Sequence, residues 1–169
     1  MLTKMQGMAR AQLAAYGKPS AGASATTTAA SAAAARRTTA ASSSHRAAAA
    51  PPPVALLDEE LRAYTLSYGG ANTYVYTAHT DGTGKDLKYV TVVAQDDGLG
   101  DVKPALQSVT DAAHLDRTPR MRLVDVVDVE ASNRASLLFE LRGQSSRQFA
   151  LYRVIAVKPE QIFLTGTTQ

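Results

Sequence analysis

The histidines and serines are the side chains of this chain that could carry acid–base or nucleophilic chemistry. The histidines are His45, His79 and His114. Ser108 or Ser136 could be placed beside a histidine, but the sequence has no Gly-x-Ser-x-Gly turn and no oxyanion-hole motif. Lone histidines are usually structural or exposed, and His114 is expected near a helix C-terminus, where its positive form favours the dipole. We therefore expect no catalytic residues and no enzymatic activity.

Thiol chemistry and nucleotide binding are also disfavoured. The chain has no cysteine, which excludes disulfides, thiolate nucleophiles, iron–sulfur clusters and cysteine-based zinc sites. Residues 82–86 are similar to part of a phosphate-binding loop, but a Walker motif requires glycine in place of His79 and Ser or Thr in place of Asp86. A flexible hairpin turn is the favoured interpretation of this stretch.

Three aspartates, Asp96, Asp97 and Asp101, share a short segment with two glycines and offer oxygen ligands for a hard cation. Their spacing does not match an EF-hand loop, and Asp101 is also placed to cap a following helix. A solvated loop is the first interpretation and a Ca²⁺ site is the alternative. We expect no tightly bound cofactor.

Four basic residues give the C-terminal part of the chain a local positive charge: Arg142, Arg147, Arg153 and Lys158. Arg153 interrupts an otherwise apolar strand, where a charge is costly unless it is paired. We expect Arg153 to meet an acidic residue of the same chain or to reach an exposed sheet face. The functional alternative is that these four residues bind an acidic loop of a membrane-protein complex.

The body of the chain predicts strands, one helix and then more strands. Residues 64–68, 73–78 and 87–94 are rich in β-branched and aromatic residues between glycine-containing turns. Apolar residues at spacings of three and four predict a helix over residues 101–115. After Pro119 the sequence predicts four sequential strands, the third of them central, at residues 121–130, 135–142, 148–157 and 161–165, with residues 158–160 as the last turn. The predicted fold class is α+β, an antiparallel meander with one helix packed on a face.

Charge divides the chain into two parts. The first 57 residues contain no Asp or Glu and six Lys or Arg, a net charge of +6. The remaining 112 contain twelve Lys or Arg against fifteen Asp or Glu, a net charge of −3. The overall charge of +3 therefore misrepresents the body, and nucleic-acid binding is not expected.

Residues 1–53 are dominated by Ala, Ser and Thr with scattered Arg, a composition typical of a disordered organelle transit peptide and linker. Residues 1–16 could form a short amphipathic helix on a membrane or import receptor. Arg36 and Arg37, followed by small residues at 47–50, match two of the three parts of a thylakoid signal, but the apolar core is missing. The alternative is a low-complexity tail. Residues 54–169 form one predicted domain, and no apolar stretch is long enough to span a bilayer.

The body resembles the PsbP family, the extrinsic proteins of photosystem II and their thylakoid-lumen relatives. The similar features are a strand with residues 90–93, a loop at 98–102, a helix, and a terminal meander holding residues 137–141 and 151–157. The resemblance covers residues 64–165. It departs from the family pattern at the end, where the family's long C-terminal helix is absent after the last predicted strand.

The resemblance implies a non-catalytic extrinsic subunit or assembly factor of photosystem II, peripheral to the membrane in the chloroplast thylakoid lumen. Such a protein supports the oxygen-evolving complex and the retention of Ca²⁺ and Cl⁻ during photosynthesis. No ligand residues of the family carry over to this chain. The alternative function is a structural or small-ligand-binding subunit of another chloroplast or mitochondrial assembly, with the stroma or the mitochondrion as the alternative location.

Overall fold

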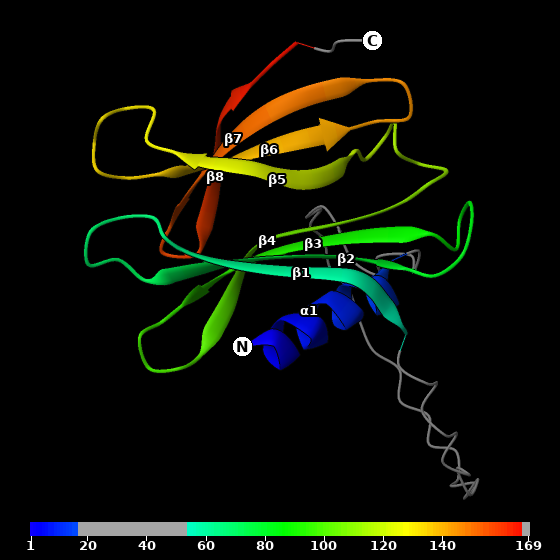
Figure 1. The fold of residues 1–169 in the computed structure, drawn as a ribbon, viewed down its shortest axis with the longest axis horizontal. Helices are drawn as coiled ribbons and strands as arrows, with labels where there is room; N and C mark the ends of the chain where they lie inside the picture. Colours follow the sequence, from blue (N-terminus) through cyan, green and yellow to red (C-terminus); the bar gives the residue numbers. More distant parts are fainter. Residues whose placement is uncertain (17–53, 167–169) are drawn as a thin grey trace, which may run out of the picture. The chain divides into compact units, whose positions relative to one another are not determined.

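One helix and two four-stranded antiparallel sheets form three layers. The computed structural model describes residues 1–16 and 54–166. Figure 1 shows the first sheet between the helix and the second sheet. The helix is α1 (Leu2–Ala15). The first sheet contains β1 (Leu56–Thr65), β2 (Asn72–Thr80), β3 (Lys88–Asp96) and β4 (Val102–Asp111), and the second contains β5 (Arg120–Val127), β6 (Ser136–Arg142), β7 (Arg147–Ile155) and β8 (Lys158–Leu164). In each sheet the strands lie side by side in sequence order.

The predicted α+β class and antiparallel meander are confirmed at this coarse level. The four sequential strands predicted after Pro119 are β5 to β8, and β7 lies between β6 and β8 as expected for a central strand. Two of the three earlier predicted strands correspond to β2 and β3. The prediction at residues 64–68 overlaps only the last two residues of β1 and otherwise lies in the β1–β2 connection. Residues 81–87 form the turn between β2 and β3. The glycine-rich stretch at 82–86 therefore forms the hairpin turn that the sequence favoured.

The helix predicted at residues 101–115 is wrong, because this segment forms β4, an edge strand paired with β3. The register shifts between Val93 and Ala94, whose partners on β4 are Leu106 and Pro104, so Ala105 is an extra residue. A bulged strand with apolar contacts on both faces produces spacings of three and four, which imitate a helix. Asp101 caps no helix; its Oδ1 accepts a hydrogen bond from the backbone N–H of Val102 at 2.9 Å.

The last turn also differs from the prediction. Residues 158–160 lie in β8. The chain reverses direction at the two residues before them, Ala156 and Val157. Their φ angles are +47° and +59°, the left-handed region that usually selects glycine or asparagine in a two-residue hairpin. Alanine and valine are not typical of such a turn. The sequence-based prediction therefore placed the turn at Lys158 and Pro159 instead.

The inner strands of the first sheet, β2 and β3, are buried on both faces. One core lies between the sheets and contains Val75 and Val93 of the first sheet with Leu137, Phe139 and Ala150 of the second. The other core lies between α1 and the first sheet. Its buried members are Met5, Ala9, Leu13, Tyr76, Ala78, Val90, Val92, Ala94 and Val102.

Helix α1 is held to the first sheet by one apolar face and by polar contacts along its length. Met5, Ala9 and Leu13 recur every four residues, so they share one face, and all three are buried. Polar contacts join the helix and its C-cap to strand residues: Gln6 to Glu59, Gln12 to Gln107 and Tyr16 to Asp111.

The expectation of disorder therefore does not hold for residues 1–16, which belong to the same compact unit as the strands. The predicted amphipathic helix is present, but its apolar face lies on the first sheet of its own chain. The rest of the predicted transit peptide, including Arg36, Arg37 and His45, lies outside the described residues, and the transit function stays a prediction. Within residues 1–16 and 54–166, no helix has the length and apolar character of a bilayer span.

The packing of α1 leads to a stability prediction. Leu13→Ala removes a side chain that is only 4% exposed, and we expect it to lower the free energy of unfolding by about 2 to 4 kcal/mol. Leu2→Ala is the matched control, since Leu2 is 44% exposed, and should change stability by less than about 0.5 kcal/mol. Urea denaturation of the full chain measures both. Equal stability of the two variants would contradict the packed helix.

Candidate functional site

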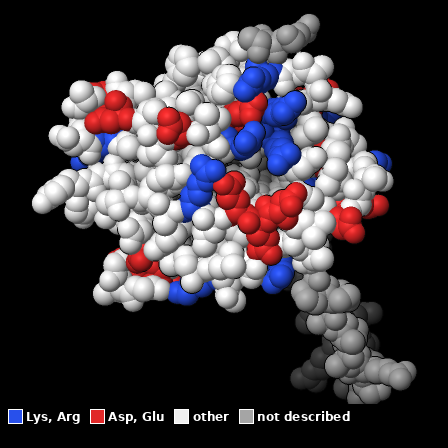
Figure 2. All heavy atoms as spheres, in the orientation of Figure 1, with Lys and Arg blue, Asp and Glu red and all other residues white. Residues whose placement is uncertain are grey.

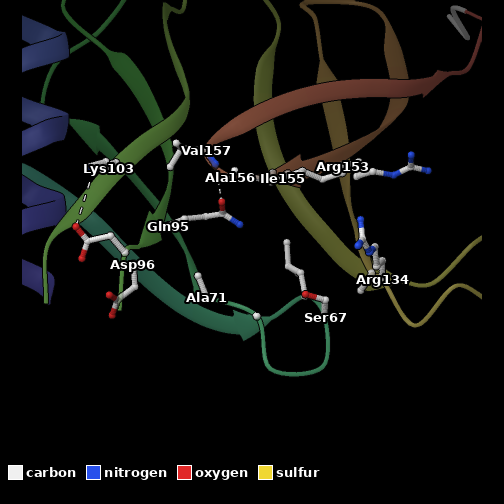
Figure 3. A pocket seen from close by; sticks show the side chains of 15 residues that line it. Ser67, Ala71, Gln95, Asp96, Lys103, Arg134, Arg153, Ile155, Ala156 and Val157 are labelled. Atoms are coloured by element: carbon white, nitrogen blue, oxygen red, sulfur yellow. Dashed lines mark hydrogen bonds and ion pairs between the residues drawn. The ribbon is translucent and has the colours of Figure 1, made fainter. Parts of the chain in front are cut away.

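A cavity of about 350 Å³ opens between the two sheets at the end where their turns converge. Its wall is mostly apolar and is formed by the β1–β2 and β7–β8 turns, the end of β3, the start of β4 and the segment before β6. Figure 3 shows the arrangement, with Gln95 reaching in from the first sheet and Arg134 and Arg153 on the side of the second. The lining residues are Leu66, Ser67, Gly70, Ala71, Gln95, Asp96, Asp97, Lys103, Arg134, Ala135, Arg153, Val154, Ile155, Ala156 and Val157.

Gln95 bridges the two sheets at this cavity. Its side-chain Nε2 donates to Thr73 Oγ1 at 3.1 Å, and its Oε1 accepts from the backbone N–H of Val157 at 2.8 Å. The second bond fixes the left-handed turn of Ala156 and Val157, a conformation that costs about 1 kcal/mol or more per non-glycine residue. A strained turn is thus held at the cavity by an amide that is only 8% exposed.

Charged side chains surround the apolar wall. Arg153 forms an ion pair with Glu130 and a longer one, at 3.9 Å, with Glu160. This confirms the expectation that Arg153 meets acidic residues of its own chain. Lys103 lies 4.0 Å from Asp97, whereas Arg134 is exposed and makes no ion pair within the described part of the chain.

The structure separates the four basic residues that were predicted to bind a partner. Arg142 and Arg147 face each other across β6 and β7 at one end of the second sheet. Arg153 and Lys158 lie near the other end of β7, beside the β7–β8 turn, and Arg153 also lines the cavity. The four therefore do not form one surface patch, and their binding of a membrane-protein loop stays a prediction.

The aspartate-rich loop is organised by its own backbone. Asp96 Oδ1 accepts from Gly98 N at 2.7 Å, and Asp97 Oδ1 accepts from Leu99 N and Asp101 N at 3.0 and 3.1 Å. The bond from Leu99 is the largest of the contacts that hold the pKa of Asp97 below its usual value. Among the described residues, no three His, Cys, Asp or Glu side chains come together as a metal site. The donor set here does not fit a cation cage, and Ca²⁺ binding stays a prediction.

The histidines within the described residues each contact a carboxylate. His114 lies in the turn after β4, without the helix dipole that was expected, and its Nδ1 is 2.7 Å from Asp111 Oδ1. Asp111 is buried, which by itself would raise its pKa, but hydrogen bonds led by that from His114 hold the pKa below its usual value. Because Asp111 also accepts the hydroxyl of Tyr16, this carboxylate joins the end of α1 to β4. Neither His79 nor His114 contacts a serine or threonine hydroxyl in the described residues.

Sequence reasoning missed the cavity because its wall comes from five separate segments. Gln95 gave a weak signal, as a polar residue that directly follows the apolar run of β3. Ala156 and Val157 gave none, since their left-handed conformation depends on contacts made by the folded protein.

His79 gives a prediction for the pH dependence of stability. Its Nδ1 lies 3.0 Å from the carbonyl oxygen of Thr80 and its Nε2 lies 2.8 Å from Asp58 Oδ2, so both ring nitrogens face acceptors. Only the protonated imidazolium ring can donate a hydrogen bond from both nitrogens. The two acceptors therefore raise the pKa of His79, and the Thr80 carbonyl contributes more than Asp58. The stabilisation is complete below the unfolded pKa of about 6.5 and is lost as pH rises through the higher folded pKa.

We therefore expect His79→Gln to remove part of the decline in unfolding free energy as pH rises above about 6.5, as measured by urea denaturation. An NMR titration of the His79 ring tests the cause directly. In the wild-type chain the pKa should lie above its ordinary value, and Asp58→Asn should move it part of the way back, because the Thr80 contact remains. A ring that titrates at the same pH in both proteins would contradict this account.

Comparison of the chain with family models, with curated proteins and with solved structures found no match.

Proposed function

We propose that this protein is a non-catalytic binding protein whose cavity between the sheets takes a small, largely apolar molecule with one anionic group. The observation that carries the proposal is the 350 Å³ cavity, with its apolar wall and a rim on which three basic residues, Lys103, Arg134 and Arg153, outnumber Asp96 and Asp97. That volume lies at the lower end of the range of known small-molecule sites, which are usually apolar with a few placed polar groups.

The wall and rim indicate the two parts of the ligand. Leu66, Ala135 and Val154 offer apolar contacts to a hydrocarbon or ring system. Arg134 is the cation at the rim with no acidic partner in the described residues, so a carboxylate or sulfonate placed beside it would form a charge-assisted hydrogen bond. Arg153 and Lys103 are already paired with acids and contribute less to charge recognition.

The role at photosystem II stays a separate hypothesis that depends on the PsbP resemblance and on the acid-free segment at residues 1–57. A peripheral protein of the thylakoid lumen and a ligand-binding subunit of another organelle assembly are both compatible with a cavity of this kind. The cavity favours the ligand-binding role, because extrinsic docking alone requires no internal space.

The test uses 1-anilinonaphthalene-8-sulfonate, which combines apolar rings with one sulfonate and fluoresces when it leaves water. Ala71→Trp places an indole at the cavity and should weaken probe binding about tenfold. Arg134→Gln should weaken it by a smaller factor, because one charge-assisted contact is lost. Fluorescence titration of the folded full chain measures both dissociation constants.

Ala63→Trp is the matched control, since Ala63 is exposed on β1 and does not line the cavity. It should leave the dissociation constant unchanged, and all variants should keep the wild-type melting temperature. Equal weakening by Ala63→Trp and Ala71→Trp, or no effect of either, would reject the cavity as the binding site.

A further inference from the structure

A row of three arginines crosses the outer face of the second sheet. Arg120 on β5 is directly opposite Arg142 on β6, and Arg142 is directly opposite Arg147 on β7. Directly opposite residues of antiparallel strands have Cβ atoms about 5 Å apart, and like charges in such pairs are destabilising. A sheet that repeats this arrangement over three strands accumulates repulsion unless an anion relieves it.

The next row contains a single carboxylate. Glu140 is directly opposite Arg122, and its Oε1 lies 2.6 Å from Nε of Arg147. A hollow of about 100 Å³ is lined by Arg120, Arg122, Glu140 and Arg142. The cluster, which we call the arginine hollow, therefore consists of four guanidinium groups around one buried carboxylate, with an excess of three positive charges.

Within the described residues, Arg147 is the arginine of the hollow that forms an ion pair, with Glu140. In the part of the chain that the structure describes, Arg122 and Arg142 make no ion pair, and Arg120 lies 4.3 Å from the centre of the Tyr89 ring. Asp116 is at the same end of the sheet, where its Oδ1 accepts from the backbone N–H of Gln144 at 2.9 Å, and no ion pair joins it to these arginines in the described residues. Figure 2 shows Lys and Arg atoms gathered over the second sheet around a few acidic atoms, with a larger acidic group next to them.

We propose that the arginine hollow is a binding site for a phosphate group, either on a soluble phosphorylated molecule or on a lipid headgroup. A phosphate dianion carries enough charge to relieve the repulsion in the row of arginines. Its oxygens match the planar, forked donors of guanidinium groups, which bind phosphate in bidentate geometry. Glu140 fixes Arg147 beside the hollow, and the hollow has the volume of one such group. This site is separate from the cavity between the sheets.

The test compares inorganic phosphate with sodium chloride at matched ionic strength, using the thermal unfolding of the full chain. At a phosphate concentration about tenfold above the dissociation constant, we expect the melting temperature to rise by about 3 to 6 °C more than in chloride. Arg142→Gln should abolish this difference. The same substitution should leave the melting temperature in phosphate-free, low-salt buffer unchanged or higher, because it removes the central charge of the row.

Lys158→Gln is the matched control, because it removes one positive charge from the same sheet, outside the hollow. It should keep the full phosphate effect. Equal loss of the effect in both variants would show diffuse electrostatics and overturn the proposal.

The source of the phosphate is tested by sedimentation with vesicles of phosphatidylcholine alone or mixed with phosphatidic acid. Binding to the mixed vesicles that is lost in Arg142→Gln and retained in Lys158→Gln identifies a headgroup. A phosphate effect on the melting temperature without vesicle binding identifies a soluble phosphorylated molecule. Absence of both the temperature shift and the vesicle binding would overturn the proposal.

Discussion

Burial of the inner strands of the first sheet on both faces is the constraint on which the rest of the structure depends. The central run of β3, from Val90 to Ala94, alternates between a core shared with α1 and a core shared with the second sheet. A strand of this composition has no face suited to water, so it requires two covering layers. α1 supplies one and the second sheet supplies the other.

The second sheet is covered on one face, and this difference explains where the two proposed sites lie. Only its inner face lies against another layer in the described residues, so its outer face can carry a cluster of arginines that would be intolerable in a core. The cavity, in contrast, lies between the sheets at the end where apolar packing gives way to turns. There a strained hairpin and a bridging amide replace the close contact of the core.

Local pattern predicted the strands well where one face was consistently apolar. Leu137, Phe139 and Leu141 alternate with Leu138, Glu140 and Arg142, and β6 follows that alternation. The pattern failed at β4, because a bulge and contacts on both faces placed apolar residues at helical spacing. A single sequence does not distinguish such a strand from an amphipathic helix, since both satisfy the same periodicity.

The candidate sites were less predictable than the fold. Arg142 and Arg147 were singled out as basic residues, but only strand register shows that Arg120 and Arg122 join them and that Arg153 and Lys158 do not. Residues 1–16 were assigned to a leader from composition, which reports what a segment contains but not what it packs against. Their partners on the first sheet extend from Glu59 to Asp111, far away along the chain.

Residues 17–53 connect α1 covalently to the strands, whereas the contacts between α1 and the first sheet are entirely noncovalent. Proteolytic cleavage between the two would therefore create a complementing pair of fragments, with the helix as a dissociable peptide ligand of the strands. The connecting chain would then no longer hold the helix at a high effective concentration beside the strands. The fraction of strands that carry the helix would depend on the protein concentration. Cleavage by a peptidase and loss of the helical layer would in that case be separate events. The lifetime of the complex between helix and strands would set the interval between them.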